Sequence, residues 1–279
     1  MTDRAPDFAL DLGAYRDLAT SLALEAGRIL LQHRAAGLHT VESKGQRREL
    51  VTAADRAAEH VVVGGLLAAF PDHAMLAEEG VLTTQGRASK VADWTWIVDP
   101  LDGTTNFVHG LPFFAVAIAL AFRNRPVVGV VHAPALGETF VAAQGLGALR
   151  LRADGSREVL RVSKTTELAD ALLATGFSYN RNEPGRDDNS ARLARVLPHC
   201  RDLRRLGSAE LDLCYTAAGV YDGYWELYLA PYDVAAGAVV VQEAGGRVAD
   251  LAGGGDWLFG GQVLASNGAL HDELLRRLG

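Results

Sequence analysis

Two acidic residues stand three positions apart at the end of an apolar run. Asp99 and Asp102 follow the run Trp-Thr-Trp-Ile-Val, which occupies positions 94–98. Two carboxylates this close at the end of a buried strand repel each other unless a cation lies between them. Hard divalent cations take oxygen ligands of this kind, and magnesium often shares them with a substrate phosphate. The pair therefore predicts a site for a divalent metal.

The residues that follow directly can bind an anion. Gly103, Thr104 and Thr105 can supply free backbone N–H groups at a turn or at the start of a helix, where an anion is stabilised. Glycine also lets the backbone approach a phosphate closely, which a Cβ could obstruct. The segment 96–107, Trp-Ile-Val-Asp-Pro-Leu-Asp-Gly-Thr-Thr-Asn-Phe, thus predicts a metal site joined to a phosphate site.

Two further acids each have a local structural interpretation. Asp55 stands three residues after Thr52 and fits the acid of a capping box at the start of a helix. Asp233 stands two residues after Pro231, and an acid at the start of a helix opened by proline suits the helix dipole whatever its function. Taken singly, neither residue identifies a site.

Three glutamates are equally ambiguous when each is taken alone. Glu78 and Glu79 precede Gly80, where a solvated turn is the simplest interpretation. Glu226 ends the aromatic strand pattern Tyr-Trp-Glu and can point to water. Any functional role for these acids has to come from their combination.

Composition limits the class of protein and of partner. The chain has 279 residues, of which 49% are hydrophobic and 22% charged, as in an ordinary globular protein with a large core. Its net charge of −7 argues against nucleic acid as the main partner, which would require a basic face. An anionic substrate remains compatible, because bound metal reverses the local sign of the charge.

Nothing in the sequence predicts export or membrane insertion. The N-terminal residues 1–8 are polar, and no stretch of about 18 apolar residues occurs. Cys200 and Cys214 form no CxxC pair, and Cys214 fits an apolar helical pattern as a core thiol. We expect a cytoplasmic protein without a membrane contact.

The pattern of apolar residues predicts a layered α/β fold. Helical spacing predicts helices over 10–34, 54–70, 189–197, 208–220, 234–243 and from 269 onward. Apolar runs predict strands over 94–98, 115–122, 127–132, 138–142, 172–175, 223–227, 248–250 and 263–265. Short turns in the first half favour antiparallel pairing there. The stretch 178–189 is rich in Arg, Asp, Asn, Pro and Gly and predicts a mobile surface loop.

The order of these motifs resembles one family. Val-Thr-x-x-Asp at 51–55, Glu-Glu-Gly at 78–80, the segment 96–107, Gly-Ser-Ala at 207–209 and Tyr-Asp-Val-Ala-Ala-Gly at 232–237 together resemble the inositol monophosphatase family. The likeness extends over about 41–246. It also covers Glu226, seven residues before Asp233, and the run Glu-Ala-Gly-Gly at 243–246.

The resemblance implies a magnesium-dependent, lithium-sensitive sugar-phosphate phosphatase. It implies an αβαβα layered sandwich and a homodimer. The whole chain, 1–279, is then expected to be a single catalytic domain with two lobes, roughly 1–146 and 147–279.

Carried over residue by residue, the resemblance implies two or three magnesium ions. One would be held by Glu78, Asp99 and the carbonyl of Leu101, and a second by Asp99, Asp102 and Asp233. A third, weaker ion would share Glu78 through water. Asp99 would bridge the first two, and a bridging acid sets the separation of about 3.5–4 Å that two-metal hydrolysis requires.

The resemblance also implies roles around the metals. Gly103 and Thr104 would hold the phosphate by their backbone N–H groups, and Thr104 with Asp55 would hold and deprotonate the attacking water. The candidate catalytic residues are therefore Asp55, Glu78 and Thr104. The candidate substrate-binding residues are Gly103, Thr104, Ser208, Ala209, Glu226 and Asp233, with Gly207 beside them.

Two basic residues near the motifs are interpreted separately. Lys44 lies eleven residues before Asp55, the separation seen in family members whose lysine faces the metal site, and a solvated loop lysine stays open as an alternative. His109 has no second histidine at ligand spacing and is interpreted as structural or surface-exposed.

The resemblance implies myo-inositol 1-phosphate as the leading substrate. In that role Glu226 would accept hydrogen bonds from ring hydroxyls, which suits a polyol better than a nucleotide. The runs 208–213 and 224–226 look most like the bacterial branch of the family. Histidinol phosphate, fructose 1,6-bisphosphate and 3′-phosphoadenosine 5′-phosphate are the alternative substrates. A non-catalytic regulatory relative is the alternative of another class, and loss of a bridging acid would have favoured it.

Overall fold

The structure is a computed structural model that describes residues 11–37, 41–43, 50–80, 93–179 and 181–279. Lys44 and the expected polar loop around it lie outside the described residues. The side chain of Thr52, the expected helix cap, also lies outside them.

A seven-stranded sheet forms the first half of the fold, in the order β3-β4-β5-β6-β7-β8-β9. Its strands are β3 Ala74–Ala77, β4 Trp94–Asp102, β5 Ala115–Phe122, β6 Arg125–Ala133, β7 Glu138–Ala143, β8 Gly147–Arg152 and β9 Arg157–Val159. All neighbours from β4 to β9 pair antiparallel, which confirms the predicted pairing, whereas β3 and β4 are parallel. A small antiparallel pair, β1 Val41–Ser43 with β2 Leu50–Thr52, lies apart from this sheet.

A five-stranded mixed sheet forms the second half, in the order β11-β10-β12-β14-β13. Its strands are β10 Leu172–Thr175, β11 Asp202–Arg204, β12 Gly223–Leu227, β13 Arg247–Ala249 and β14 Gln262–Ser266. Strand β10 is parallel to β11 and β12, and β14 is antiparallel to β12 and β13.

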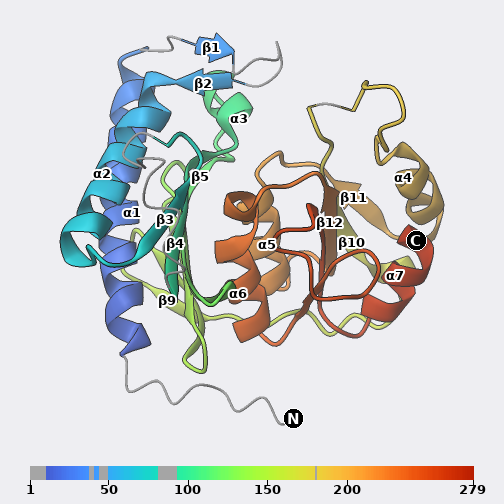
Figure 1. The fold of residues 1–279 in the computed structure, drawn as a ribbon. Helices are drawn as coiled ribbons and strands as arrows, with labels where there is room; N and C mark the ends of the chain where they lie inside the picture. The colour runs from blue at the N-terminus through green and yellow to red at the C-terminus, as the bar shows by residue number, and fades with distance from the viewer. Residues whose placement is uncertain (1–10, 38–40, 44–49, 81–92, 180) are drawn as a thin grey trace.

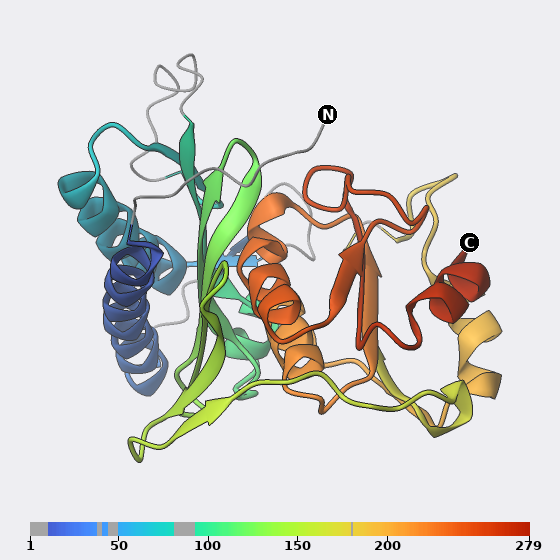
Figure 2. The same ribbon diagram turned by 90° about the horizontal axis from the view of Figure 1, so that it is seen from below.

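The helices form three layers around the two sheets. They are α1 Leu12–Ala35, α2 Ala53–Ala69, α3 Thr104–Val108, α4 Ser190–Val196, α5 Ala209–Ala217, α6 Ala235–Glu243 and α7 His271–Leu278, with 3₁₀ turns at η1 Leu168–Asp170, η2 Leu197–His199 and η3 Pro231–Asp233. Figures 1 and 2 show α1 and α2 outside the first sheet, α5 and α6 between the sheets, and α4 and α7 outside the second. The predicted αβαβα order is therefore confirmed.

Each layer boundary buries its own apolar cluster. Leu22, Leu66 and Trp96 pack between the outer helices and the first sheet. Phe140, Leu211 and Val239 belong to the cluster that joins both sheets to α5 and α6. A third cluster joins the second sheet to α4 and α7. None of the helices in the described part of the chain is long and apolar enough to cross a membrane.

Strand β4 is longer than its apolar pattern predicts. The expected strand ends at Val98, but β4 continues through Pro100 to Asp102 with an irregular register between Asp99 and Asp102. Because proline cannot donate to a ladder, it is tolerated at such an irregularity. Both acids therefore lie on the strand itself.

Candidate active site

Asp99 and Asp102 are held at the irregular end of β4, and both are buried, with exposed fractions of 2% and 7%. The Asp99 carboxylate accepts a hydrogen bond from the backbone N–H of Leu101 at 2.9 Å. The local chain thus orients one carboxylate, although it supplies no cation to neutralise it.

Helix α5 holds Asp102 from the other side. The Ser208 hydroxyl donates to Asp102 at 2.6 Å, and the backbone N–H groups of Ala209 and Glu210 donate at 3.2 and 2.9 Å. These groups stand at the start of α5, where free N–H groups and the helix dipole favour a negative charge. Asp102 therefore connects the first sheet to the central helix layer.

The expected phosphate loop forms a tight turn into α3. Gly103 has a φ of 90°, a left-handed conformation that favours glycine. A Cβ at Gly103 would lie 2.8 Å from the carbonyl oxygen of Phe113 and 3.3 Å from that of Gly207. Only glycine therefore fits this turn, and the turn leads directly into Thr104 at the start of α3.

Asp55 approaches this turn from helix α2. It is 1% exposed, and its Oδ1 lies 3.4 Å from Thr104 Oγ1. Thr104 Oγ1 also lies 3.1 Å from the carbonyl oxygen of Leu101. The contact between Thr104 and Asp55 joins residues 49 positions apart in the chain, so the outer helix layer contributes to the site.

Asp233 and Glu226 reach the same region from the second half. The Asp233 carboxylate accepts the backbone N–H of Ala230 at 2.6 Å, which closes the 3₁₀ turn η3 before α6. Glu226 lies near the end of β12 and accepts the Tyr224 hydroxyl at 2.6 Å. Gly176 makes room for Glu226, since a Cβ there would overlap its carboxylate.

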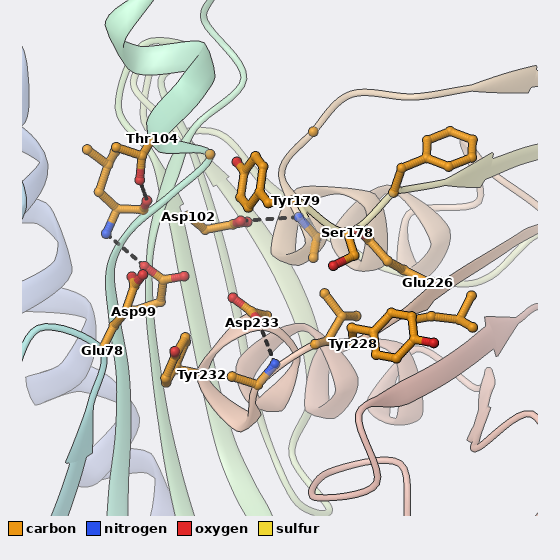
Figure 3. A pocket seen from close by; sticks show the side chains of 18 of the residues that line it. Glu78, Asp99, Asp102, Thr104, Ser178, Tyr179, Glu226, Tyr228, Tyr232 and Asp233 are labelled. Atoms are coloured by element: carbon orange, nitrogen blue, oxygen red, sulfur yellow. Dashed lines mark hydrogen bonds between the residues drawn. The ribbon is translucent and has the colours of Figure 1, made fainter. Parts of the chain in front are cut away.

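One pocket of about 230 Å³ brings most of the expected residues together. Those that line it are Glu78, Asp99, Leu101, Asp102, Gly103, Thr104, Ala209, Glu226 and Asp233. Figure 3 shows Asp99, Asp102 and Asp233 around one space, with Glu226 farther along it. Ser208 is buried behind the lining against Asp102, and Asp55 lies behind Thr104.

The two remaining sequence candidates lie off the pocket lining. Glu79 donates its backbone N–H to Glu59 at 2.7 Å and is a neighbour of Glu78. His109 is exposed at the C-cap of α3, which agrees with its interpretation as a surface residue.

Burial and mutual repulsion destabilise these acids as anions. Burial raises the pKa of Asp99 well above its ordinary value, and the charges of Glu78, Asp102 and Asp233 raise it further. Burial also raises the pKa of Asp233. The Ser208 and backbone hydrogen bonds lower the pKa of Asp102, but burial outweighs them. A divalent cation between these carboxylates would offset both costs.

The donor set fits magnesium. Glu78, Asp99, Asp102 and Asp233 offer only carboxylate oxygens, and the Leu101 carbonyl adds another oxygen. Within the described residues, no three histidine, cysteine or acidic side chains lie close enough together to hold a metal ion as they stand. An open arrangement suits magnesium, which keeps several waters and completes its octahedron with substrate phosphate.

Several polar side chains in or beside the pocket were not indicated by the sequence patterns. Arg186, Arg205 and Tyr179 line it from loops whose residues carry no periodic signal. Glu210 is fully buried and accepts the backbone N–H groups of Ala236 and Gly237 at the start of α6. Its place directly after Ser208 and Ala209 was the only signal in the sequence. A single sequence could not distinguish it from a glutamate on the helix surface.

Comparisons with known proteins identify the family of the chain. The model of the family described as "Inositol monophosphatase family" matches residues 11–278. A protein of Pseudomonas aeruginosa named Nus factor SuhB is 44% identical over 229 residues, covering 82% of each chain. An inositol-1-monophosphatase of Synechocystis is 39% identical and covers 96% of this chain and 90% of its own.

Solved structures show the same fold. The structure of inositol monophosphatase from Anabaena superposes with a TM-score of 0.82 at 39% identity, covering 96% of both chains. An IMPase from Thermotoga maritima superposes with a TM-score of 0.82 at 35% identity, covering 95% of this chain. The family match, the relatives and the fold together show that the chain belongs to the inositol monophosphatase family.

Proposed function

We propose that this protein is a magnesium-dependent phosphatase that hydrolyses a small polyol phosphate monoester, with myo-inositol 1-phosphate as the first candidate substrate. The observation that carries the proposal is one pocket that gathers Glu78, Asp99, Asp102 and Asp233 beside the turn at Gly103. Four acids from three separate segments have no structural reason to line the same pocket, because each raises the cost of ionising the others.

Magnesium bound by these acids would supply activation of a water and stabilisation of the departing oxygen. The backbone N–H groups of Gly103 and Thr104 bind the phosphate, since they stand at the start of α3. The Thr104 hydroxyl has one hydrogen, so it donates either to Leu101 or to Asp55 and accepts from the attacking water. When Thr104 donates to Asp55, the water can pass a proton to Thr104 Oγ1 while Thr104 passes its own hydrogen to Asp55.

The far side of the pocket suits a polyol. Glu226 offers carboxylate oxygens to ring hydroxyls, and Tyr179, Tyr228 and Tyr232 line the same pocket. A pocket of about 230 Å³ lies below the usual range of about 300–1,000 Å³ for ligand sites, which favours a small ester over a nucleotide. Histidinol phosphate, fructose 1,6-bisphosphate and 3′-phosphoadenosine 5′-phosphate are the alternatives.

Partners and location belong to the same proposal. The net charge of −7 supports a small molecule rather than nucleic acid as the main partner. Some relatives carry the name Nus factor, which describes those proteins. The intact acids of this chain support hydrolysis as its role. The proposal also includes a cytoplasmic location and a homodimer.

A panel of phosphate esters tests the proposal. Purified protein is freed of metal with a chelator and then assayed for release of inorganic phosphate with and without magnesium. The substrates are the phosphates of inositol, histidinol, fructose and adenosine. We expect magnesium-dependent release, fastest with myo-inositol 1-phosphate. If no ester is hydrolysed in magnesium, the chain is a non-catalytic relative and the proposal fails.

A further inference from the structure

Two basic side chains line the otherwise acidic pocket. They are Arg186, from the loop before α4, and Arg205, from the loop before α5. Hydroxyl groups do not require a guanidinium, whose planar set of donors matches a carboxylate or a phosphate. The presence of both arginines at one pocket therefore calls for an explanation beyond polyol binding.

Arg205 has no partner of its own in the protein. It is exposed, and across the described ranges it forms no ion pair and donates no hydrogen bond. Other arginines of this chain behave differently: Arg150 pairs with Glu138 and Glu158 at 3.2 and 2.7 Å. All the N–H donors of Arg205 are therefore available to a ligand.

A glycine beside the phosphate turn leaves room for the guanidinium of Arg205. A Cβ at Gly207 would overlap Nη1 of Arg205, so the guanidinium lies directly against the Gly207 backbone. The carbonyl oxygen of Gly207 accepts Asn106 Nδ2 at 3.3 Å and would lie 3.3 Å from a Cβ at Gly103. Arg205 thus lies next to the turn that is expected to hold the scissile phosphate.

The field of Arg205 extends along the polyol side of the pocket. Its charge lowers the pKa of Asp102, Asp212 and Glu226, although burial outweighs this effect in all three. None of these carboxylates is within 4.0 Å of it, the limit for an ion pair. Arg205 therefore acts electrostatically on both Asp102, beside the phosphate turn, and Glu226, and it forms an ion pair with neither.

Arg186 is held in the same pocket by an aromatic contact. Its guanidinium carbon lies 4.0 Å from the centre of the Tyr228 ring, which follows β12 directly. Its Nη1 donates to Glu183 at 2.7 Å, and Nη2 has no hydrogen bond within the described structure. One face of this guanidinium is therefore supported by Tyr228, and one terminal nitrogen remains available.

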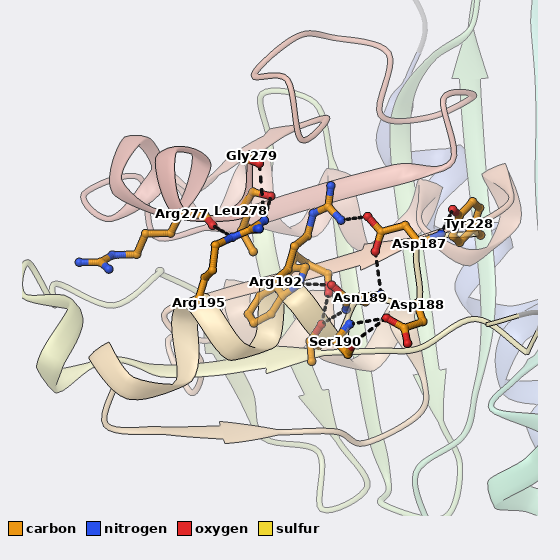
Figure 4. A network of polar contacts seen from close by, with 12 residues as sticks. Asp187, Asp188, Asn189, Ser190, Arg192, Arg195, Tyr228, Arg277, Leu278 and Gly279 are labelled. Carbon is orange, nitrogen blue, oxygen red and sulfur yellow. Dashed lines mark hydrogen bonds and ion pairs between the residues drawn. The ribbon is translucent and has the colours of Figure 1, made fainter. Parts of the chain in front are cut away.

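The loop that carries Arg186 is anchored on both sides, as Figure 4 shows. The backbone N–H of Asp187 donates to the Tyr228 hydroxyl at 3.0 Å, and the Asp187 carboxylate pairs with Arg192 of α4. Asn189, which is 2% exposed, donates to Thr175 at 2.9 Å and accepts Trp225 Nε1 at 2.9 Å. These bonds tie the loop to the two strands behind the polyol side of the pocket.

We propose that Arg205, assisted by Arg186, forms a second anion subsite, which strengthens the binding of phosphate monoesters that carry another anionic group. The inference rests on the proposed phosphatase function and extends its substrate class to doubly anionic esters. The scissile phosphate is already served by the Gly103 turn and by cations on the acids, so the free guanidinium donors are left for a second phosphate or carboxylate. Among the small alternatives, fructose 1,6-bisphosphate has this feature and histidinol phosphate lacks it.

Matched substrate pairs test the subsite. Fructose 1,6-bisphosphate is compared with fructose 1-phosphate, and 6-phosphogluconate with sorbitol 6-phosphate, by initial rates of phosphate release in magnesium. The first pair differs by a phosphate and the second by a carboxylate. A charge-assisted pair with arginine predicts a preference of about tenfold or more in kcat/KM for one or both doubly anionic members. The pair with the larger preference identifies the anion, and equal kcat/KM within both pairs overturns the proposal.

Two variants separate a ligand contact from general electrostatics. Arg205→Gln should remove most of the preference by raising KM for the doubly anionic member of each pair, and its effect on the singly anionic member should be smaller. Arg205→Lys should restore part of it. The control is Arg204→Gln, because Arg204 is an exposed neighbour paired with Asp202 at 2.7 Å and does not line the pocket. Equal losses for both members of each pair in Arg205→Gln would contradict a subsite.

Calorimetry gives a readout that does not require turnover. Binding of fructose 1,6-bisphosphate and fructose 1-phosphate is measured in the presence of calcium, a hard cation that takes the same oxygen ligands with looser geometry. Tighter binding of the bisphosphate, lost in Arg205→Gln, supports the subsite even if no ester is hydrolysed. Hydrolysis of monoesters with no difference in affinity between the two ligands leaves the phosphatase standing and overturns the subsite alone.

Discussion

Glu226 is the carboxylate of the pocket whose ionisation falls near neutral pH. Burial raises its pKa to about 7, although the Tyr224 hydroxyl and the charge of Arg205 act in the opposite direction. Only the ionised form accepts hydrogen bonds on both oxygens, as a wall for substrate hydroxyls requires. Under the proposed function, the protonation state of Glu226 should therefore affect substrate binding as well as stability.

We predict that Glu226 makes the metal-free protein less stable as pH rises. Its folded-state pKa lies above the ordinary 4.5, so between about pH 4.5 and 7 the folded state holds a proton that the unfolded chain releases. The free energy of unfolding should therefore fall through this window. Urea unfolding at pH 5 and pH 8 measures the effect against Glu226→Gln, in which this contribution is absent. The variant should gain up to about 3 kcal/mol on the wild type between these pH values.

An equal difference between the two proteins at both pH values would show that Glu226 ionises normally. The comparison with the variant is needed because burial lowers the pKa of His132 and His271 to about 4. These histidines make the folded protein more stable as pH rises toward 6.5, which opposes the effect of Glu226. Their contribution cancels in the difference.

At the scale of single residues, the sequence indicated a candidate site only where its residues lie close together in the chain. Asp99, Asp102 and Gly103 are adjacent, so their spacing alone indicated a metal beside a phosphate. Arg205 and Glu210 were not predicted, because their meaning depends on what other segments bring beside them: the room above Gly207, and the N-terminus of α6. Reasoning from a single segment of the sequence cannot predict such contacts.

The elements around the site are coupled through Glu210 of α5. Its backbone N–H holds Asp102 at 2.9 Å, and its carboxylate accepts the N–H groups of Ala236 and Gly237. Helix α6 has no hydrogen bond from an N-cap side chain, so Glu210 caps it from a neighbouring helix. Because Asp233 lies two residues before the first residue of α6, this contact also supports the turn that carries it.

Glu210→Ala should destabilise the protein by about 2–5 kcal/mol, because it leaves two buried N–H groups without an acceptor. Glu210→Gln keeps one oxygen acceptor and should lose about half as much. Chemical unfolding of the metal-free proteins measures both. Glu167→Ala is the control, since Glu167 is exposed before η1 and should change stability by less than about 0.5 kcal/mol. Equal stability of Glu210→Ala and the wild type would contradict the capping role.

The turn between β4 and α3 should tolerate no side chain at Gly103. Gly103→Ala places a Cβ 2.8 Å from the carbonyl oxygen of Phe113 and shifts the N–H groups expected to hold phosphate. A displacement of about 1 Å in such a site costs on the order of a hundredfold in rate, so we expect kcat/KM to fall by at least tenfold.

Gly145→Ala is the matched control for this backbone strain. Gly145 has a φ of +79°, close to that of Gly103, but a Cβ there meets nothing within 4 Å. Both variants carry the cost of a left-handed alanine, about 1–2 kcal/mol, and only one disturbs the phosphate turn. Similar phosphatase rates for the two variants would contradict the role given to the Gly103 turn.

At the scale of elements, long periodic segments were predicted well and short polar ones were not. The expected strands 115–122, 172–175 and 223–227 agree with β5, β10 and β12, because their apolar runs are bounded by turn residues. Strands β8, β9 and β11 were not predicted: β9 and β11 have three residues each, and two arginines interrupt the apolar residues of β8. Their pairing is set by the neighbouring strand rather than by their own pattern.

The whole molecule places the site where its two halves meet. Asp99 and Asp102 come from the seven-stranded sheet, and Asp233 and Glu226 come from the second half, on η3 and β12. Helices α5 and α6 lie between the two sheets and contact both. Cations bound by these acids would therefore connect the halves. The sequence predicted the order of the layers, but which segments meet at this junction depends on tertiary packing.

Magnesium should raise the melting temperature of the metal-free protein, because a ligand that binds only the folded state stabilises it. At a magnesium concentration about a hundredfold above its dissociation constant, the gain is about 2.7 kcal/mol, or several degrees. Asp233→Asn keeps an oxygen to accept the Ala230 N–H and loses the charge, so most of the gain should disappear in it. Asp93→Asn, an exposed acid paired with Arg123, should keep the full gain. Equal shifts in both variants would place magnesium elsewhere.

The most direct test is the initial rate of phosphate release from myo-inositol 1-phosphate as magnesium is titrated into the metal-free protein. The wild type should be inactive without magnesium and should saturate as it is added. Asp99→Asn, which removes the expected bridging carboxylate, should lose at least a thousandfold in rate while its circular dichroism spectrum is unchanged. Release that is independent of magnesium, or full activity in Asp99→Asn, would contradict the account.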